Sequence, residues 1–201
     1  MSILEITDYI GIIAFALSGY WVAAQHKLDI LGAFIVAFLT ALGGGVIRDI
    51  LTGATPYAFT HTLPAAIVIG VVASAYLLRL QRFFDYQKKL IFLLSDGLGL
   101  VSFSISGAMA ALSAQFNFFG VMLVALITAV GGGVVRDILL NEIPFILRTG
   151  FYGTIAILTG AFIFLFNEIE FLNPYTVTLL FLFSLFLRLW AIFGKWSLPK
   201  L

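Results

Sequence analysis

The chain has 201 residues, of which 62% are hydrophobic and 10% are charged, and its mean hydropathy is +1.11. Soluble domains average about 45–50% apolar and about 25% charged residues, so this composition excludes a soluble domain and predicts an integral membrane protein. A net charge of +1 without a basic block argues against a nucleic-acid partner, and the absence of cysteine excludes disulfides, thiol catalysis and cysteine-ligated metals.

Seven apolar runs approach the roughly 20 residues that a helix needs to cross a bilayer. Short polar breaks separate them, and they cover residues 8–26, 31–51, 62–79, 90–114, 118–140, 149–166 and 175–193. We expect the first run to be a retained helix, because Glu5 and Asp8 stand where a signal peptide carries basic residues. The pattern predicts an all-α integral membrane protein with seven transmembrane helices in a single membrane domain, residues 1–201.

The second run contains three glycines and an arginine–aspartate pair (Gly43 to Asp49), and the fifth run repeats this pattern 88 residues later. The same displacement aligns Asp8 with Asp96, Ser18 with Ser106, Thr40 with Thr128, and Pro56 with Pro144. We infer two three-helix repeats, residues 1–79 and 89–167, and a seventh helix at 175–193. Because three is odd, the second repeat enters the membrane from the opposite side, which gives a 3+3 inverted repeat plus one C-terminal helix.

Basic residues are expected on the cytoplasmic face of a membrane protein. With seven helices, one face carries Lys27, Arg79, Arg82, Lys88, Lys89, Arg148, Lys195 and Lys200, and the other carries Glu5, Glu168 and Glu170. We therefore expect a multi-pass protein, in a prokaryotic plasma membrane, with its N-terminus outside and its C-terminus in the cytoplasm.

The glycine triplets predict breaks in two membrane helices, because each glycine in a helix interior costs roughly 1 kcal/mol relative to alanine. Free backbone groups in a membrane must face protein or water. We interpret both triplets and the hydroxyls at similar depth as an ion pathway: Gly43, Gly44, Gly45, Gly131, Gly132, Gly133, Ser18, Ser106, Thr40 and Thr128. Two alternatives stay open: the glycines allow close helix contact, or the serines bond to carbonyls of their own helices.

Intramembrane charges usually face an interior or an aqueous cavity. The pairs Arg48–Asp49 and Arg136–Asp137 follow the glycines, so we place one pair at each pore mouth. The alternative is structural pairing or snorkelling of the arginines to the headgroups. Asp8 and Asp96 are interpreted as helix-start carboxylates, since negative charge there complements the helix dipole.

The remaining polar residues give no sign of catalysis. Two isolated histidines, His26 and His61, do not make a metal site, and Ser/His/Asp, HExxH and Walker patterns are absent from the sequence. The protein is not expected to be an enzyme. Arg188, near Trp190 and Trp196, is interpreted as an anchor at the cytoplasmic interface.

The doubled segments GGGVIRDIL and GGGVVRDILL, within seven helices and a 3+3 duplication, resemble the prokaryotic members of the trimeric intracellular cation (TRIC) channel family. The resemblance covers nearly the whole chain. It implies a homotrimer in which each subunit has a potassium-permeable pore lined by glycine-kinked second and fifth helices. The implied kinks are Gly43 to Gly45 and Gly131 to Gly133. The same bacterial families are also described as glycine-transporter domain proteins.

Together these features lead us to expect a passive channel for monovalent cations such as potassium, with a pore in each subunit. Its expected partners are further copies of itself, membrane lipids and monovalent cations. We expect no cofactor beyond the permeant potassium or sodium ion. The alternative is a secondary transporter of glycine or another small neutral solute.

Overall fold

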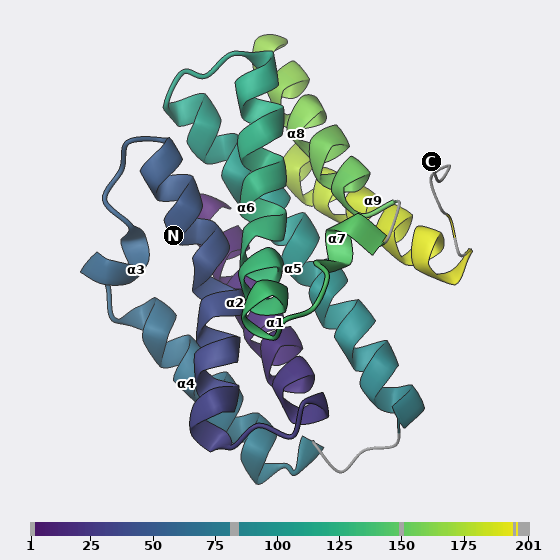
Figure 1. Cartoon of the computed structure of the whole chain (residues 1–201). Helices are drawn as coiled ribbons and strands as arrows, with labels where there is room; N and C mark the ends of the chain where they lie inside the picture. Colours follow the sequence, from purple (N-terminus) through teal and green to yellow (C-terminus); the bar gives the residue numbers. More distant parts are fainter. Residues whose placement is uncertain (1–2, 81–84, 149–150, 195, 197–201) are drawn as a thin grey trace.

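The computed structural model describes residues 3–80, 85–148, 151–194 and 196, and all regular structure in these residues is helical (Figure 1). Two shorter apolar helices accompany five that are long and apolar enough to cross a membrane. The shorter ones are α4 (Leu63–Leu77) and α8 (Gly153–Glu168), and the long ones are α1 (Ile3–Gln25), α2 (Ile30–Leu51), α5 (Asp85–Ser113), α6 (Phe118–Leu139) and α9 (Pro174–Phe193). The expected all-α membrane protein is confirmed, whereas the count of seven membrane crossings stays a prediction.

Two short helices, α3 (Tyr57–Thr60) and α7 (Phe145–Arg148), have no counterpart among the expected elements. Each follows a proline, Pro56 or Pro144, and the two helices start 88 residues apart. A helix of four residues buries too little apolar surface to produce a hydropathy signal. The long helices begin close to the expected residues, except that α1 and α5 each begin five residues earlier.

Side-chain caps fix where three of the long helices begin. Asp29 precedes α2 and accepts a hydrogen bond from the Gly32 amide at 2.7 Å, and Asn117 precedes α6 and accepts one from the Gly120 amide at 2.9 Å. Asn173 forms a reciprocal capping box at the start of α9. Each cap satisfies amides that the first helical turn leaves without an intrahelical partner.

The helices α1 and α5 form the centre of the bundle, and they pack through a reciprocal pair of phenylalanines. The rings of Phe15 and Phe103 meet edge to face at 5.3 Å between centroids. Phe103 lies over Gly11 of α1, and Phe15 lies over Gly99 of α5, so each ring fills the space that a side chain on the facing helix would occupy. This contact holds the two halves of the chain together.

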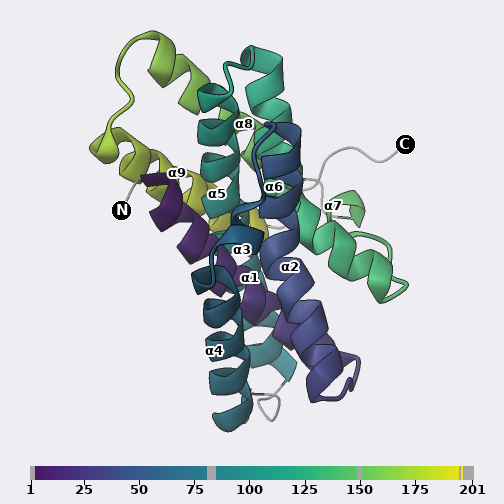
Figure 2. The same ribbon diagram turned by 90° about the vertical axis from the view of Figure 1, so that its left-hand side faces the viewer.

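The helices α2 and α6 run in opposite directions and cross at their glycine triplets (Figures 1 and 2). Both helices are continuous through the glycines, so the expected breaks are absent and the expectation of glycine-broken helices was wrong. Gly44 lies against the carbonyl oxygen of Thr128, and Gly132 lies against that of Thr40. Helix contact this close is possible only where the side chain is a hydrogen atom, and the packing gained there offsets the poor helix propensity of glycine.

The helix α9 packs against α5 and α8 in the second half of the chain. Val177 and Leu180 of α9 lie in one apolar cluster with Val101, Ile105 and Ile163. A hydrogen bond between the hydroxyls of Thr159 and Ser184, 2.9 Å long, joins α8 to α9. The C-terminal helix is therefore an integral part of the bundle rather than an appended anchor.

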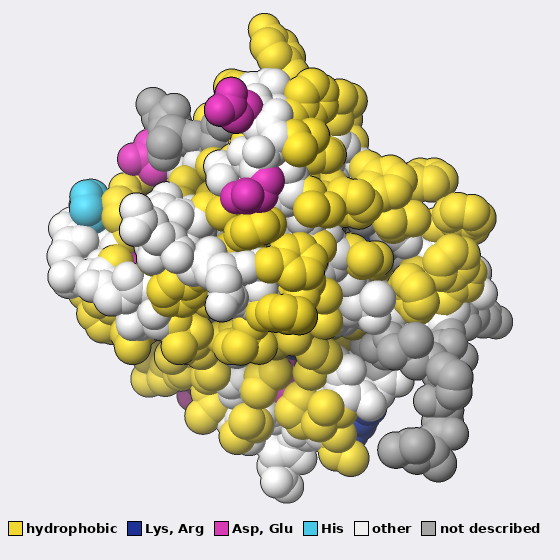
Figure 3. Space-filling model, turned by 90° about the horizontal axis from the view of Figure 1, so that it is seen from above, with side chains coloured by type: hydrophobic (Ala, Val, Ile, Leu, Met, Phe, Trp, Pro, Cys, Tyr) yellow, Lys and Arg dark blue, Asp and Glu magenta, His cyan; other side chains and the backbone are white. Residues whose placement is uncertain are grey.

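Charged side chains are distributed unevenly between the two ends of the bundle. Figure 3 looks onto the upper end of the bundle in Figure 1 and shows acidic side chains there. The helix α8 ends with the exposed Glu168, and the exposed Glu170 follows two residues later. Lys27 and Arg79 follow the lower ends of α1 and α4 in Figure 1. The other expected cytoplasmic residues except Arg148 lie outside the residues whose side chains are described: Arg82, Lys88, Lys89, Lys195 and Lys200.

Candidate functional site

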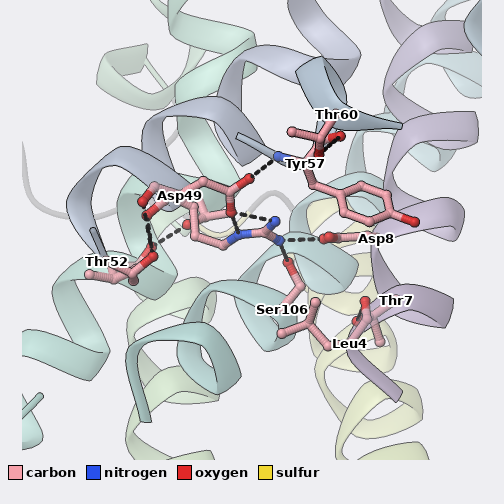
Figure 4. Close-up of polar contacts among 11 residues, drawn as sticks. Leu4, Thr7, Asp8, Asp49, Thr52, Tyr57, Thr60 and Ser106 are labelled. Carbon is pink, nitrogen blue, oxygen red and sulfur yellow. Dashed lines mark hydrogen bonds and ion pairs between the residues drawn. The ribbon is translucent and has the colours of Figure 1, made fainter. Parts of the chain in front are cut away.

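A buried arginine of α2 joins three helices in what we call the α2 cluster, which consists of Asp8, Arg48, Asp49 and Ser106. The Arg48 side chain is only 4% exposed. Its Nη1 donates to Asp8 Oδ1 of α1 at 2.6 Å and to Ser106 Oγ of α5 at 2.8 Å. Its Nε donates to the neighbouring Asp49 at 2.8 Å. Figure 4 shows these groups converging on the guanidinium, which thereby crosslinks both halves of the chain.

A second arginine occupies the corresponding place in α6, in what we call the α6 cluster: Ser18, Asp96, Arg136 and Asp137. The Arg136 Nε donates to Asp137 Oδ1 at 2.8 Å, and Nη1 donates to Ser18 Oγ of α1 at 3.0 Å. Asp96 is fully buried, and its Oδ1 lies 3.6 Å from Arg136 Nη1. At that distance the pair is an ion pair without a hydrogen bond. Within the described part of the chain, neither carboxylate oxygen of Asp96 meets the geometry of a hydrogen bond, although Asp96 interacts with the Tyr152 hydroxyl.

The aspartate of each Arg–Asp pair also holds the short helix that follows. Asp49 Oδ2 accepts the backbone amide of Tyr57 at 2.8 Å, and Asp137 Oδ2 accepts that of Phe145 at 2.7 Å. These residues are the first of α3 and α7. Each aspartate therefore orients its arginine with one oxygen and anchors a surface helix with the other. The sequence signal for this arrangement is the matched spacing of Pro56 and Pro144 after the two Arg–Asp pairs.

The expected role of Asp8 and Asp96 was wrong, and the expected role of Thr40 and Thr128 stays untested. Asp8 and Asp96 do not start their helices, because α1 begins at Ile3 and α5 begins at Asp85, and both carboxylates instead face arginines. The hydroxyls of Thr40 and Thr128 donate to the carbonyls of Val36 and Val124 one turn earlier in their own helices. They are buried at the crossing, and whether they line an ion path stays a prediction.

Ser18 and Ser106 have a role that the sequence did not reveal, since each accepts a hydrogen bond from the arginine of the other half. This bond predicts that Ser106→Ala destabilises the protein by about 1–3 kcal/mol, because a buried guanidinium loses an acceptor. Thermal unfolding in detergent measures the effect. Ser104→Ala is the matched control, because the Ser104 hydroxyl bonds only to the Leu100 carbonyl of its own helix. Equal effects of the two substitutions would contradict the role of Ser106.

The two clusters differ in the space beside them. A cavity of about 430 Å³ adjoins the α2 cluster, and Glu5, Tyr9, Tyr57 and Ser113 contribute to its lining together with Asp8 and Arg48. The cavity beside Arg136 and Asp137 of the α6 cluster has only about 10 Å³, which is close to the minimum for one water molecule. A second cavity beside the α2 cluster, lined by the corresponding residues, is also small, at about 20 Å³. The structure is thus open beside the α2 cluster and closed beside the α6 cluster.

Arg188 belongs to the closed side, and its expected place as an interfacial anchor was wrong. The residue is 3% exposed, and its guanidinium carbon lies 4.6 Å from the centre of the Tyr152 ring and 6.0 Å from that of Phe145. The nearby tryptophans suggested an interface, but Trp190 itself is half exposed and points elsewhere on α9. Only the packing of α9 onto α5 and α8 reveals the burial of Arg188.

A family model and several bacterial membrane proteins match the sequence of this chain. A family model described as "Glycine transporter" matches two segments, residues 5–79 and 93–168. The UPF0126 membrane protein YvgT of Bacillus subtilis is 33% identical over 203 residues, which cover 98% of this chain and 95% of the relative. A UPF0126 membrane protein of Deinococcus radiodurans is 37% identical over 154 residues, with 74% and 69% coverage.

Solved structures with the same fold are TRIC channels. A structure from work on conductance through TRIC cation channels is 37% identical, with a TM-score of 0.84 and coverage of 98% and 96% of the two chains. A prokaryotic TRIC channel crystallised in 0.5 M KCl is 34% identical, with a TM-score of 0.90 and 98% coverage of each chain. The TRIC trimeric intracellular cation channel orthologue from Rhodobacter sphaeroides is 25% identical, with a TM-score of 0.88.

Proposed function

Because this chain belongs to the bacterial membrane-protein family that unites the UPF0126 proteins and the prokaryotic TRIC channels, we propose that it is a passive channel for monovalent cations, chiefly potassium. The observation that carries the proposal is the pair of buried arginine clusters, each built between the two halves of the chain. They offer carboxylate and hydroxyl oxygens, which are suitable ligands for a partly dehydrated cation.

The charge of the α2 cluster favours a cation over an anion. Asp8 and Asp49 carry two negative charges against the single positive charge of Arg48, and Glu5 adds another negative charge to the cavity lining. A cleft lined by one sign of charge raises the local concentration of the opposite ion. The cavity beside the α2 cluster is therefore our proposed mouth for cations.

The proposed path runs from this mouth past Ser106, along the crossing of α2 and α6, and past Ser18 to the α6 cluster. In this structure Arg48 and Arg136 donate hydrogen bonds to these two serine hydroxyls. A cation that displaces each guanidinium would use the freed hydroxyl and carboxylate oxygens in turn. Weak binding at several such sites permits exit as well as entry. The glycine crossing is the proposed narrow part of the path.

The same proposal includes the membrane arrangement. Two matches of one family model and the opposite directions of α2 and α6 support a 3+3 inverted repeat with α9 as the added helix. The acidic upper face, opposite Lys27 and Arg79, supports an outer N-terminus and a cytoplasmic C-terminus. Similarity to a trimeric orthologue supports a homotrimer. Lipid would cover the exposed apolar side chains around the bundle.

A secondary glycine transporter is the second candidate, because the matching family model carries that description. Purified protein in liposomes separates the two functions. We expect potassium efflux that increases linearly with the gradient, and no accumulation of labelled glycine against its gradient. Saturable glycine uptake without potassium efflux would favour the transporter. Empty liposomes provide the baseline for both measurements.

A further inference from the structure

Arg188 gives the α6 cluster a second buried cation, which it receives from the helix outside the repeats. The α2 cluster, as defined above, contains one arginine and two aspartates. With Arg188 the α6 cluster contains two arginines and two aspartates, so its charges balance. Arg188 interacts electrostatically with Asp96, and within the described residues its Nε and Nη2 have no hydrogen-bond partner. Two of the three guanidinium nitrogens therefore lack hydrogen bonds, and the charge of Asp96 and the face of the Tyr152 ring hold the side chain.

A sequence difference between the repeats leaves room for Arg188 beside the α6 cluster. A Cβ atom on Gly97 would lie 3.2 Å from Arg188 Cγ, so the arginine stem passes directly over this glycine. The position 88 residues earlier is Tyr9, whose hydroxyl lies 2.9 Å from that of Tyr57. A tyrosine at position 97 would thus occupy the space that Arg188 fills.

The difference between Tyr9 and Gly97 corresponds to a difference in the open space beside the two clusters. Asp8 is bonded to Arg48 at 2.6 Å beside a cavity of about 430 Å³. Asp96 lies 3.6 Å from Arg136 and interacts with Arg188, and its neighbour Arg136 lines a cavity of only about 10 Å³. A cation approaching Asp96 would meet a buried guanidinium in place of water.

We propose that Arg188 closes the α6 end of the permeation path by filling the space beside Asp96 and neutralising its charge. The inference rests on the proposed channel function. Withdrawal of α9 from α5 and α8 would expose Asp96 and give the α6 end the excess negative charge that the α2 end already has. The C-terminal helix is thereby a regulatory element that controls the conductance of the pore.

Two substitutions take the charge of Arg188 away from Asp96 by different routes. Arg188→Ala removes the guanidinium, and Gly97→Tyr displaces the arginine stem from the space over position 97. We expect each to increase the unitary cation conductance at least about threefold in about 0.1 M salt, with a smaller increase in about 1 M salt, where charges are screened. Arg188→Lys keeps the charge and should remain near the wild-type conductance. Arg148→Ala is the matched control, because it removes an exposed arginine whose side chain is 52% exposed. A merely structural role of Arg188 would lower the conductance instead.

A second measurement does not depend on ion flux. The chain has no cysteine, so Val134→Cys, at the cavity beside the α6 cluster, introduces one thiol. A charged thiol reagent that does not cross membranes should label it at least about tenfold faster when Arg188→Ala is also present, because the opened side admits water. Should Arg188→Ala fail to fold, Arg188→Ser carries the same prediction, because it also leaves the space of the arginine side chain empty.

The outcomes separate this inference from the proposed function. A conducting wild type, with unchanged or lower conductance and unchanged labelling in the folded variants, would overturn the role of Arg188 and leave the channel intact. A wild type that conducts no cations would overturn the channel, and the labelling rates would still decide whether Arg188 closes the α6 side.

Discussion

Replacing Gly132 by alanine is expected to destabilise the protein by about 3 kcal/mol, which lowers the unfolding temperature by about 6–12 °C for a chain of this size. The added Cβ would overlap the carbonyl oxygen of Thr40, and it would lie 2.9 Å from the carbonyl carbon. These are backbone atoms of a continuous helix, so α2 and α6 must move apart. The measurement is thermal unfolding of the purified protein in detergent, monitored as the loss of the folded peak in size-exclusion chromatography.

The next glycine in the same triplet supplies the control. A Cβ on Gly133 would meet Arg136 Nη2 at 3.7 Å, which is an ordinary contact. Alanine is favoured over glycine in a helix by about 1 kcal/mol, so Gly133→Ala should leave stability unchanged or raise it. Gly44→Ala should behave like Gly132→Ala, because Gly44 lies against the Thr128 carbonyl. Similar unfolding temperatures for Gly132→Ala and Gly133→Ala would show that the crossing does not require its middle glycines.

Replacing Arg48 by methionine is expected to cost about 3–5 kcal/mol, because two buried carboxylates lose their counter-ion. Asp8 and Asp49 are each 7% exposed, and Arg48 contacts both. Adding Asp8→Asn to Arg48→Met should recover part of the loss, since one buried charge is then removed. A double-mutant cycle from unfolding free energies measures the coupling between Arg48 and Asp8, which we expect to exceed about 1.5 kcal/mol.

The surface pair of Arg148 and Glu142 is the control for this cycle. Arg148 Nη2 lies 3.3 Å from Glu142 Oε2, and the two side chains are 52% and 45% exposed. Arg148→Met should change stability by less than about 1 kcal/mol, because water screens an exposed pair. If Arg48→Met were tolerated as well as Arg148→Met, Arg48 would not be the crosslink described above.

The membrane helices could be predicted from the sequence because hydropathy and the repeated motif both report on burial in lipid. The helices α2 and α6 begin and end within one residue of the expected ranges. The four-residue helices α3 and α7 could not be predicted, since tertiary hydrogen bonds from Asp49 and Asp137 anchor their first residues. The expected breaks at the glycines were wrong because helix propensity, a local preference, was outweighed by contact between two helices.

The residues of the site could be predicted better than their partners. The duplication pointed to Arg48 and Arg136, but the acceptors of their hydrogen bonds lie 58 and 118 residues away in the chain. A serine beside a glycine has a local alternative, a bond to its own helix, and only the packing of α1 and α5 brings Ser18 and Ser106 to the arginines of the other half. Arg188 was misplaced for the same reason. The neighbouring tryptophans are visible in the local sequence, whereas the space over Gly97 that receives Arg188 exists only in the folded structure.

Single-channel recording of the purified protein in planar bilayers tests the proposed cation channel most directly. In a potassium chloride gradient we predict ohmic unitary currents that reverse close to the equilibrium potential of potassium. Arg148→Ala should leave that reversal potential unchanged. Saturable glycine transport with no unitary current, or currents that reverse at the chloride equilibrium potential, would contradict the account.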